Sequence, residues 1–141
     1  MQNITFQVKK EGERTYIFCL VRKKYVLLTP EEKVRQYTLK TLAEEAKYPL
    51  QFISVEKTLT VNGMKKRWDI LVFNKNLQPW LLIECKNSSL ALNQQTLHQV
   101  GTYNIALKVP YLAITNGNDW KLFEIDIEAT AFKSLDIFPE W

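Results

Sequence analysis

Glycine and histidine are scarce in this sequence, and both shortages exclude classes of function. The four glycines stand too far apart for a dinucleotide-binding fingerprint or a phosphate-binding loop, which excludes a nucleotide-driven motor. A single histidine, His98, and two distant cysteines, Cys19 and Cys85, cannot build a structural zinc site. Any metal ion would therefore be held mainly by carboxylates, which favour a hard ion such as magnesium over zinc.

Long hydrophobic runs are missing as well. No apolar stretch approaches the roughly 18 residues that a membrane-spanning helix needs, and residues 1–10 lack the apolar stretch of an export signal. We therefore expect a soluble, cytoplasmic protein with free thiols and no membrane partner. The 141 residues, of which 46% are hydrophobic and 24% charged, are typical of one globular domain, residues 1–141.

Basic residues outnumber acidic residues by 19 to 15, and part of this excess is clustered. Two basic clusters stand beside predicted strand ends, where a phosphate backbone can be met. We interpret both as nucleic-acid-binding, and the alternative is that they are solubilising charges at turns. The first cluster is Arg22, Lys23 and Lys24, and the second is Lys65, Lys66 and Arg67.

The residue pattern predicts an α/β domain with a mixed central sheet and a core of residues 29–127. A helix begins with Thr29 as N-cap, Pro30 at the first helical position and Glu32 closing a capping box, and it runs to about Lys47. The final residues, 128–141, show little periodicity, and we expect their aromatic side chains to pack against the domain. The other predicted elements are an N-terminal hairpin (14–28), a three-stranded meander (51–61, 64–73 and 80–86), a second helix (92–107) and two strands (111–115 and 120–127).

Charged residues on the meander form the most informative cluster. Glu84 and Lys86 lie two residues apart on the third strand and so share a face of the sheet. With the preceding turn centred between Asn76 and Leu77, antiparallel register sets Asp69 opposite Glu84, with Cβ atoms about 4.5–5.5 Å apart. Two carboxylates at this separation repel each other unless a cation lies between them.

A divalent ion held by Asp69, Glu84 and the backbone carbonyl of Cys85 would remove this repulsion and keep positions open for water. Such an ion activates water and stabilises charge on a phosphoryl group, while Lys86 would position or polarise that water. The alternative is a solvated Glu84–Lys86 pair at a strand end. However, Glu84 follows an apolar run typical of a buried strand, where an unpaired charge is costly.

Asp69, followed by Glu84-Cys85-Lys86 in an order of helix, three strands, helix and strand, resembles the pattern of the PD-(D/E)XK nuclease superfamily. Five segments of the chain are together more closely similar to the N-terminal nuclease domain of type I restriction enzyme R subunits and its small stand-alone relatives, over residues 14–123. The resemblance implies a restriction-endonuclease-like core of helix, three-stranded meander, helix and strand. The segments are Thr29 to Gln36, Lys66 to Asp69, Leu82 to Lys86, Gln99 with Tyr103, and Thr115 to Gly117.

The resemblance implies that Asp69 and Glu84 bind magnesium, with manganese as a substitute, and that Lys86 is the catalytic lysine. It also implies a carboxylate on the first helix. A helical wheel groups Glu31 with the apolar stripe, so Glu31 is the inward-facing candidate and Glu32 serves the cap. The alternative is that both glutamates only interact favourably with the helix dipole in the first turn.

Gln99 and Tyr103 are spaced to share one face of the second helix. In related nucleases this glutamine is an active-site residue, and Tyr103 would face the nucleic acid. The alternative is a glutamine at the helix surface, while His98 is interpreted as structural or surface-exposed.

The expected function is a magnesium-dependent DNA endonuclease domain that hydrolyses phosphodiester bonds, with low sequence specificity of its own. DNA, other restriction-modification subunits and a second copy of the chain are the partners considered. The chain departs from the family after Lys86, where Asn87-Ser88-Ser89 replaces a small residue and proline, and 141 residues leave no room for a motor. The alternatives are a non-catalytic nucleic-acid-binding or partner-recruiting module on the same fold and a protein-interaction domain.

Overall fold

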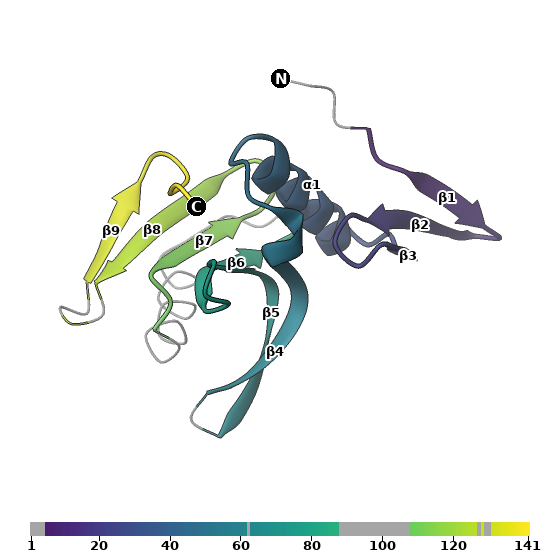
Figure 1. Cartoon of the computed structure of the whole chain (residues 1–141). Helices are drawn as coiled ribbons and strands as arrows, with labels where there is room; N and C mark the ends of the chain where they lie inside the picture. The colour runs from purple at the N-terminus through teal and green to yellow at the C-terminus, as the bar shows by residue number, and fades with distance from the viewer. Residues whose placement is uncertain (1–4, 62, 88–107, 127, 129–130) are drawn as a thin grey trace.

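The fold is described from a computed structural model, which places residues 5–61, 63–87, 108–126, 128 and 131–141. The described residues form one α-helix, one short 3₁₀ helix, a six-stranded mixed sheet and a three-stranded antiparallel sheet (Figure 1). Among the described residues, no helix is long and apolar enough to cross a membrane. The elements are β1 (Val8–Glu11), β2 (Arg14–Cys19), β3 (Lys24–Leu27), α1 (Pro30–Glu44), the short 3₁₀ helix η1 (Leu50–Phe52), β4 (Ile53–Val61), β5 (Met64–Phe73), β6 (Pro79–Cys85), β7 (Tyr111–Thr115), β8 (Trp120–Asp126) and β9 (Ala131–Leu135).

The N-terminal sheet has three strands, where the sequence predicts a hairpin of two. β1 is the additional strand, and it pairs with β2 through a tight turn in which Gly12 has a φ of +62°. All four residues of β1 are exposed, so the strand carries none of the apolar alternation by which strands are recognised. The pairing of β2 with β3 agrees with the prediction.

Helix α1 begins as predicted, since the hydroxyl of Thr29 accepts a hydrogen bond from the Glu32 backbone N–H at 3.0 Å. Only half of the capping box forms, because the Glu32 side chain turns into the protein instead of back to the cap. The helix ends at Glu44, earlier than predicted, and Lys47 follows in a left-handed conformation with a φ of +61°. Val34, Leu39 and Leu42 then pack this helix onto one face of the large sheet.

The large sheet runs in the order β4-β5-β6-β7-β8-β9, and its centre is where sequence patterns are strongest. The predicted bounds of β5 and β7 are confirmed to the residue, and β6 is buried on both faces as expected. Among the described strands, only β6 and β7 pair in parallel, which makes the sheet mixed. Parallel neighbours need a crossover between them, and the predicted helix 92–107 in that crossover lies outside the described residues.

The C-terminal residues contain a strand that the sequence does not reveal. β9 pairs with β8 along its whole length, although four of its five residues are exposed. The aromatic part of the prediction is confirmed, because Phe138 and Trp141 pack against the main core. The indole N–H of Trp141 also donates to the carbonyl of Phe73 at 2.9 Å, which fixes the end of the chain to β5.

Candidate functional site

The candidate site lies where β5 and β6 stop pairing. The register Ile70↔Ile83 and Leu71↔Leu82 agrees with the sequence prediction, and its next step places Asp69 against Glu84. This register arises through a bulge near Phe73, which compensates for a turn shorter than the one assumed. Two carboxylates therefore face the point where the two strands separate.

The side chain of Asp69 occupies this separation. Its Oδ2 atom accepts a hydrogen bond from the backbone N–H of Cys85 at 2.9 Å, in the place where strand-to-strand pairing would otherwise continue. The backbone N–H of Lys86 donates instead to the carbonyl of Thr115 on β7, at 2.8 Å. β6 is thus held on both sides just where its charged residues begin.

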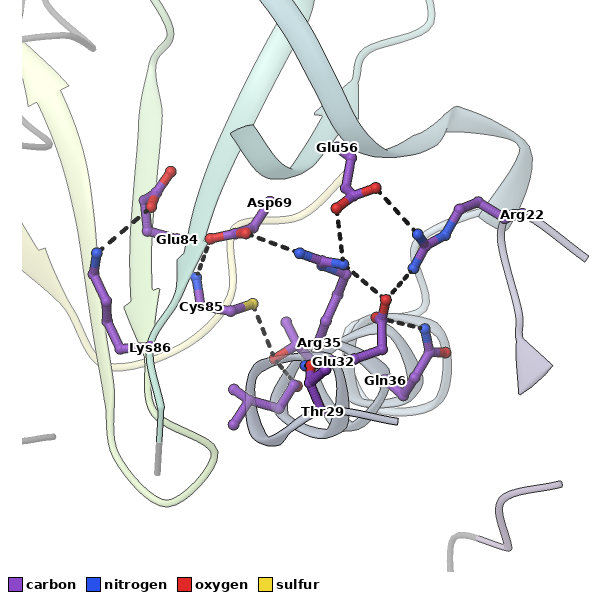
Figure 2. Close-up of polar contacts among 12 residues, drawn as sticks. Arg22, Thr29, Glu32, Arg35, Gln36, Glu56, Asp69, Glu84, Cys85 and Lys86 are labelled. Carbon is purple, nitrogen blue, oxygen red and sulfur yellow. Dashed lines mark hydrogen bonds and ion pairs between the residues drawn. The ribbon is translucent and has the colours of Figure 1, made fainter. Parts of the chain in front are cut away.

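Glu84 and Lys86 complete the cluster on β6. Lys86 Nζ lies 3.8 Å from Glu84 Oε2, which confirms that the two residues share a face. The Glu84 side chain is only 9% exposed and that of Lys86 is 34% exposed, so the lysine bridges the buried acid and the solvent. Figure 2 shows Asp69 on the middle of β5 near Glu84 and Lys86 at the C-terminal end of β6.

A second group of charges extends from Asp69 toward α1. Arg35 Nη2 lies 3.1 Å from Asp69 Oδ1, while Arg35 Nη1 lies 2.9 Å from Glu32 and 3.5 Å from Glu56. Arg22, from the turn between β2 and β3, approaches the same two carboxylates at 2.5 Å and 3.2 Å. This arrangement connects the N-terminal sheet with the candidate site (Figure 2).

The electrostatics of these groups follow from burial and pairing. Burial alone would lower the pKa of Arg35, but the charges of Glu32 and Asp69 raise it above its ordinary value. Burial raises the pKa of the Cys85 thiol, and the charge of Asp69 adds to this effect. The thiol stays protonated near neutral pH, which leaves oxygen atoms as the donors of the site.

The orientation predicted for the first-helix glutamates is wrong. Glu31 is exposed, whereas Glu32 is 6% exposed and contacts Arg22, Arg35 and Gln36. The helical-wheel prediction took the apolar residues alone as the buried face. The buried face of α1 also contains charged and polar residues, among which Glu32 pairs with Arg35 and Gln36. On the helix, Arg35 pairs with Glu32, three residues earlier, at 2.9 Å.

Among the predicted DNA-contacting residues that the structure describes, Arg22 differs from the others because its charge is paired within the protein. The Arg22 side chain is 18% exposed and its charge is already paired, so it is not free to meet a phosphate. Lys23 and Lys24 are exposed at the adjacent turn, and Lys65 and Arg67 are exposed on β5. Gln99 and Tyr103 lie outside the described residues, and so does the side chain of Lys66.

The sequence analysis did not predict that Glu56 lies beside the site or that the Arg35 side chain is buried there. Glu56 has a φ of +54° and drops out of the ladder between the pairs Val55↔Ile70 and Lys57↔Trp68. No residue pattern in the sequence announces this break. Arg35 lies three residues after Glu32 in the helix, and this spacing was the available signal.

The donor set fits a hard divalent cation. Asp69 and Glu84 offer carboxylate oxygens, and a backbone carbonyl with water would complete the coordination of magnesium. Within the described residues there is no group of three or more histidine, cysteine, aspartate or glutamate side chains that could hold a metal. Four carboxylates and three cationic side chains leave the site one negative charge, which favours binding a cation.

Comparison with known proteins supports a relationship over most of the chain. The family model described as type I restriction enzyme R protein N terminus (HSDR_N) matches residues 30–139. A solved fragment assigned to the HsdR subunit of a type I restriction enzyme from Vibrio vulnificus YJ016 is similar in fold, with a TM-score of 0.57 and 23% identity over 80% of this chain. The chain spans only 24% of the length of that protein. Among curated proteins, no sequence match is found.

Proposed function

Because the chain belongs to the family of type I restriction enzyme R protein N-termini, we propose that it is a magnesium-dependent DNA endonuclease domain of the PD-(D/E)XK type. Asp69 and Glu84 are the proposed metal ligands, together with the backbone carbonyl of Cys85, and Lys86 is the catalytic lysine. Manganese would substitute for magnesium because it accepts the same oxygen donors.

The observation that carries this proposal is the position of Asp69. Its side chain is fixed by the Cys85 backbone N–H in the opening between two strands, next in register to Glu84 and beside Lys86. Two acids and one lysine gathered beside one strand opening, with Glu84 largely buried, are typical of a functional site. On β6, Glu84 directly follows the buried apolar residues Leu81, Leu82 and Ile83, so its charge stands out from the strand that carries it.

Each residue then has a defined task. Asp69 and Glu84 would hold magnesium, which would supply an activated water and charge stabilisation at the phosphoryl group. The hydrogen bond from the Cys85 backbone N–H keeps the Asp69 side chain from rotating away. Lys86, whose side chain is partly exposed, would neutralise negative charge that develops on the phosphate. Gln99, in the helix predicted for residues 92–107, remains a proposed assisting residue.

DNA would be held mainly through its backbone. Beyond Asp69, residues 57–61 and 64–68 pair only with each other and project from the sheet as a two-stranded arm (Figure 1). Lys57, Lys65 and Arg67 are exposed on this arm, and Lys23 and Lys24 are exposed at the end of the N-terminal sheet. Contacts of this kind give affinity without reading sequence. Specificity would then come from other restriction-modification subunits.

The proposal is tested by cleavage of duplex, branched and single-stranded DNA at low salt, with and without magnesium. We expect cleavage by the parent and its loss in Asp69→Asn and in Lys86→Ala, with Lys121→Ala, an exposed lysine on β8, as the matched control. Calorimetry should show magnesium binding to the parent and not to Asp69→Asn. Absence of both cleavage and magnesium binding in the parent would refute the proposal and leave a nucleic-acid-binding module on the same fold.

A further inference from the structure

Arg35 joins Asp69 to two acids that are not among the proposed metal ligands. One nitrogen of its guanidinium, Nη2, lies 3.1 Å from Asp69 Oδ1, and the other, Nη1, lies 2.9 Å from Glu32 and 3.5 Å from Glu56. The Arg35 side chain is 8% exposed, so it is not placed to meet DNA. Its planar fork can hold two groups at a fixed relative position, which an ammonium cannot do.

Arg22 closes this arrangement from the other side. Its Nη2 lies 2.5 Å from the same Glu32 oxygen that Arg35 contacts, and its Nη1 lies 3.2 Å from the second oxygen of Glu56. Arg22, Glu32, Arg35 and Glu56 therefore form a closed ring of alternating charge, here called the guanidinium ring. Two positive and two negative charges cancel within it, so its influence on Asp69 depends on geometry more than on net charge.

The backbone at Glu56 adds an independent observation. Its φ of +54° is uncommon for a residue with a side chain, and it removes Glu56 from the β4–β5 ladder. In this conformation the Glu56 carboxylate contacts both arginines of the ring. Unusual backbone conformations persist where surrounding contacts hold them, and they cluster at functional sites.

We propose that Arg35 is a positioning residue for Asp69, and that Arg22 holds Arg35 in place through the guanidinium ring. This inference rests on the proposed function, since it explains how one metal ligand is kept in position. Asp69 is held from two sides, by Arg35 on Oδ1 and by the Cys85 N–H on Oδ2. The N-terminal sheet, through Arg22, thereby becomes part of the support of the site.

The experiment compares Arg35→Met, Arg35→Lys and Arg22→Met with Arg14→Met, which removes an exposed arginine of β2. The first readout is NMR hydrogen exchange of the Cys85 amide, which depends on neither metal nor activity. We expect the protection of the Cys85 amide to fall about tenfold in Arg35→Met, less in Arg22→Met, and not at all in Arg14→Met. The reason is that a less firmly held Asp69 side chain accepts the hydrogen bond of the Cys85 N–H for less of the time.

The second readout is magnesium affinity, measured by calorimetry. The sign of its change in the variants distinguishes a positioning role of Arg35 from a purely electrostatic one. A purely electrostatic Arg35 repels the ion, so its removal would raise the affinity. A positioning Arg35 predicts a lower affinity in Arg35→Met and a smaller loss in Arg35→Lys. In single-turnover cleavage at saturating magnesium and DNA, we expect a rate loss of about a hundredfold in Arg35→Met, as for a displaced catalytic group.

The positioning role is overturned if Cys85 protection is unchanged in Arg35→Met, or if Arg35→Lys matches the parent in every readout. Should Arg35→Met fail to fold, Arg35→Lys and Arg22→Met decide the question. The double variant Arg22→Met/Arg35→Met should be no worse than Arg35→Met alone, and additive effects would refute the link through the ring. A parent that neither binds magnesium nor cleaves DNA would refute the proposed function, while the exchange data would still test the positioning of Asp69.

Discussion

Asp69 Oδ2 and the backbone N–H of Cys85 are joined by a hydrogen bond of 2.9 Å that crosses from one strand to the next. A side chain here replaces the carbonyl that would normally continue the ladder, so β5 and β6 can separate without leaving a buried donor unsatisfied. The acid is therefore part of the fold and part of the candidate site at once. Its replacement has to be judged by both criteria.

Asp69→Ala should destabilise the protein more than Asp69→Asn. Alanine leaves the Cys85 N–H and one nitrogen of Arg35 without their acceptor, at a cost of about 1–3 kcal/mol in the free energy of unfolding. Asparagine keeps an acceptor oxygen for one of them. Urea denaturation of the two variants measures the difference, and equal stability would mean that the hydrogen bonds of Asp69 contribute nothing to the fold.

Glu31 and Glu32 provide a matched pair of neighbouring acids on α1. Glu32→Gln removes the charge that pairs with Arg22 and Arg35, and we expect a loss of about 3 kcal/mol, as for a broken buried ion pair. Glu31→Gln changes an exposed side chain near the helix start and should cost less than about 1 kcal/mol. Chemical denaturation decides, and a larger loss for Glu31→Gln would contradict the observed orientation.

Tyr48 should make the protein sensitive to alkali. Its hydroxyl donates to the carbonyl of Pro139 at 2.6 Å, and burial raises its pKa above the ordinary value of 10.0, with a smaller contribution from Tyr111. The unfolded chain ionises first, so the stability that Tyr48 confers is complete below about pH 10 and falls as the pH rises further. Unfolding midpoints between pH 8 and pH 11 measure this decline.

The variant Tyr48→Phe isolates this contribution. It should cost about 1 kcal/mol at pH 8, where the hydrogen bond is intact, and its stability should decline less steeply with pH than that of the parent. Tyr37→Phe, at a ring that is 40% exposed, is the control. Parallel pH curves for the parent and Tyr48→Phe would show that this hydroxyl is not responsible.

The exposed basic residues of β5 and the paired Arg22 should differ in their contribution to DNA binding. Lys65→Ala and Arg67→Ala should each reduce the slope of log K against log salt by up to about 0.9, because each removes one phosphate contact. Arg22→Met should leave this slope unchanged, since its charge is paired inside the protein. Fluorescence anisotropy with duplex DNA at several salt concentrations measures the slopes, and a reduced slope for Arg22→Met would place Arg22 on the DNA after all.

Local signals explain what could be predicted from the sequence. Asn62-Gly63 marks a tight turn and the apolar run before Glu84 marks a buried strand, so β5 and the approach of Asp69 to Glu84 follow from short-range patterns. β7 is bounded by turn residues in the same way. The proximity of Asp69 on β5 to Glu84 and Lys86 on β6 depends on the register between two neighbouring strands. The alternation of apolar and polar residues along the strands largely fixes that register.

The guanidinium ring could not be predicted by the same reasoning. Arg22, Arg35 and Glu56 come from three separate elements, and each one alone resembles an ordinary surface charge. Their burial is tolerable only because they meet, which is a property of the assembled fold. β1 and β9 escaped detection for a related reason, because their mostly exposed residues carry no alternating apolar pattern and each strand is recognised by its pairing with a neighbour.

The parallel pairing of β6 with β7 has a consequence for the order in which the chain matures. Antiparallel hairpins such as β4–β5 form between neighbours in sequence, whereas the β6–β7 pair waits until the whole crossover after Lys86 has been synthesised and brought back. The backbone contact of Lys86 with Thr115 belongs to this late step. A chain emerging from the ribosome thus carries its acids and lysine early but secures β6 only after β7 has emerged, so the charged cluster gains its final form later than the β4–β5 hairpin.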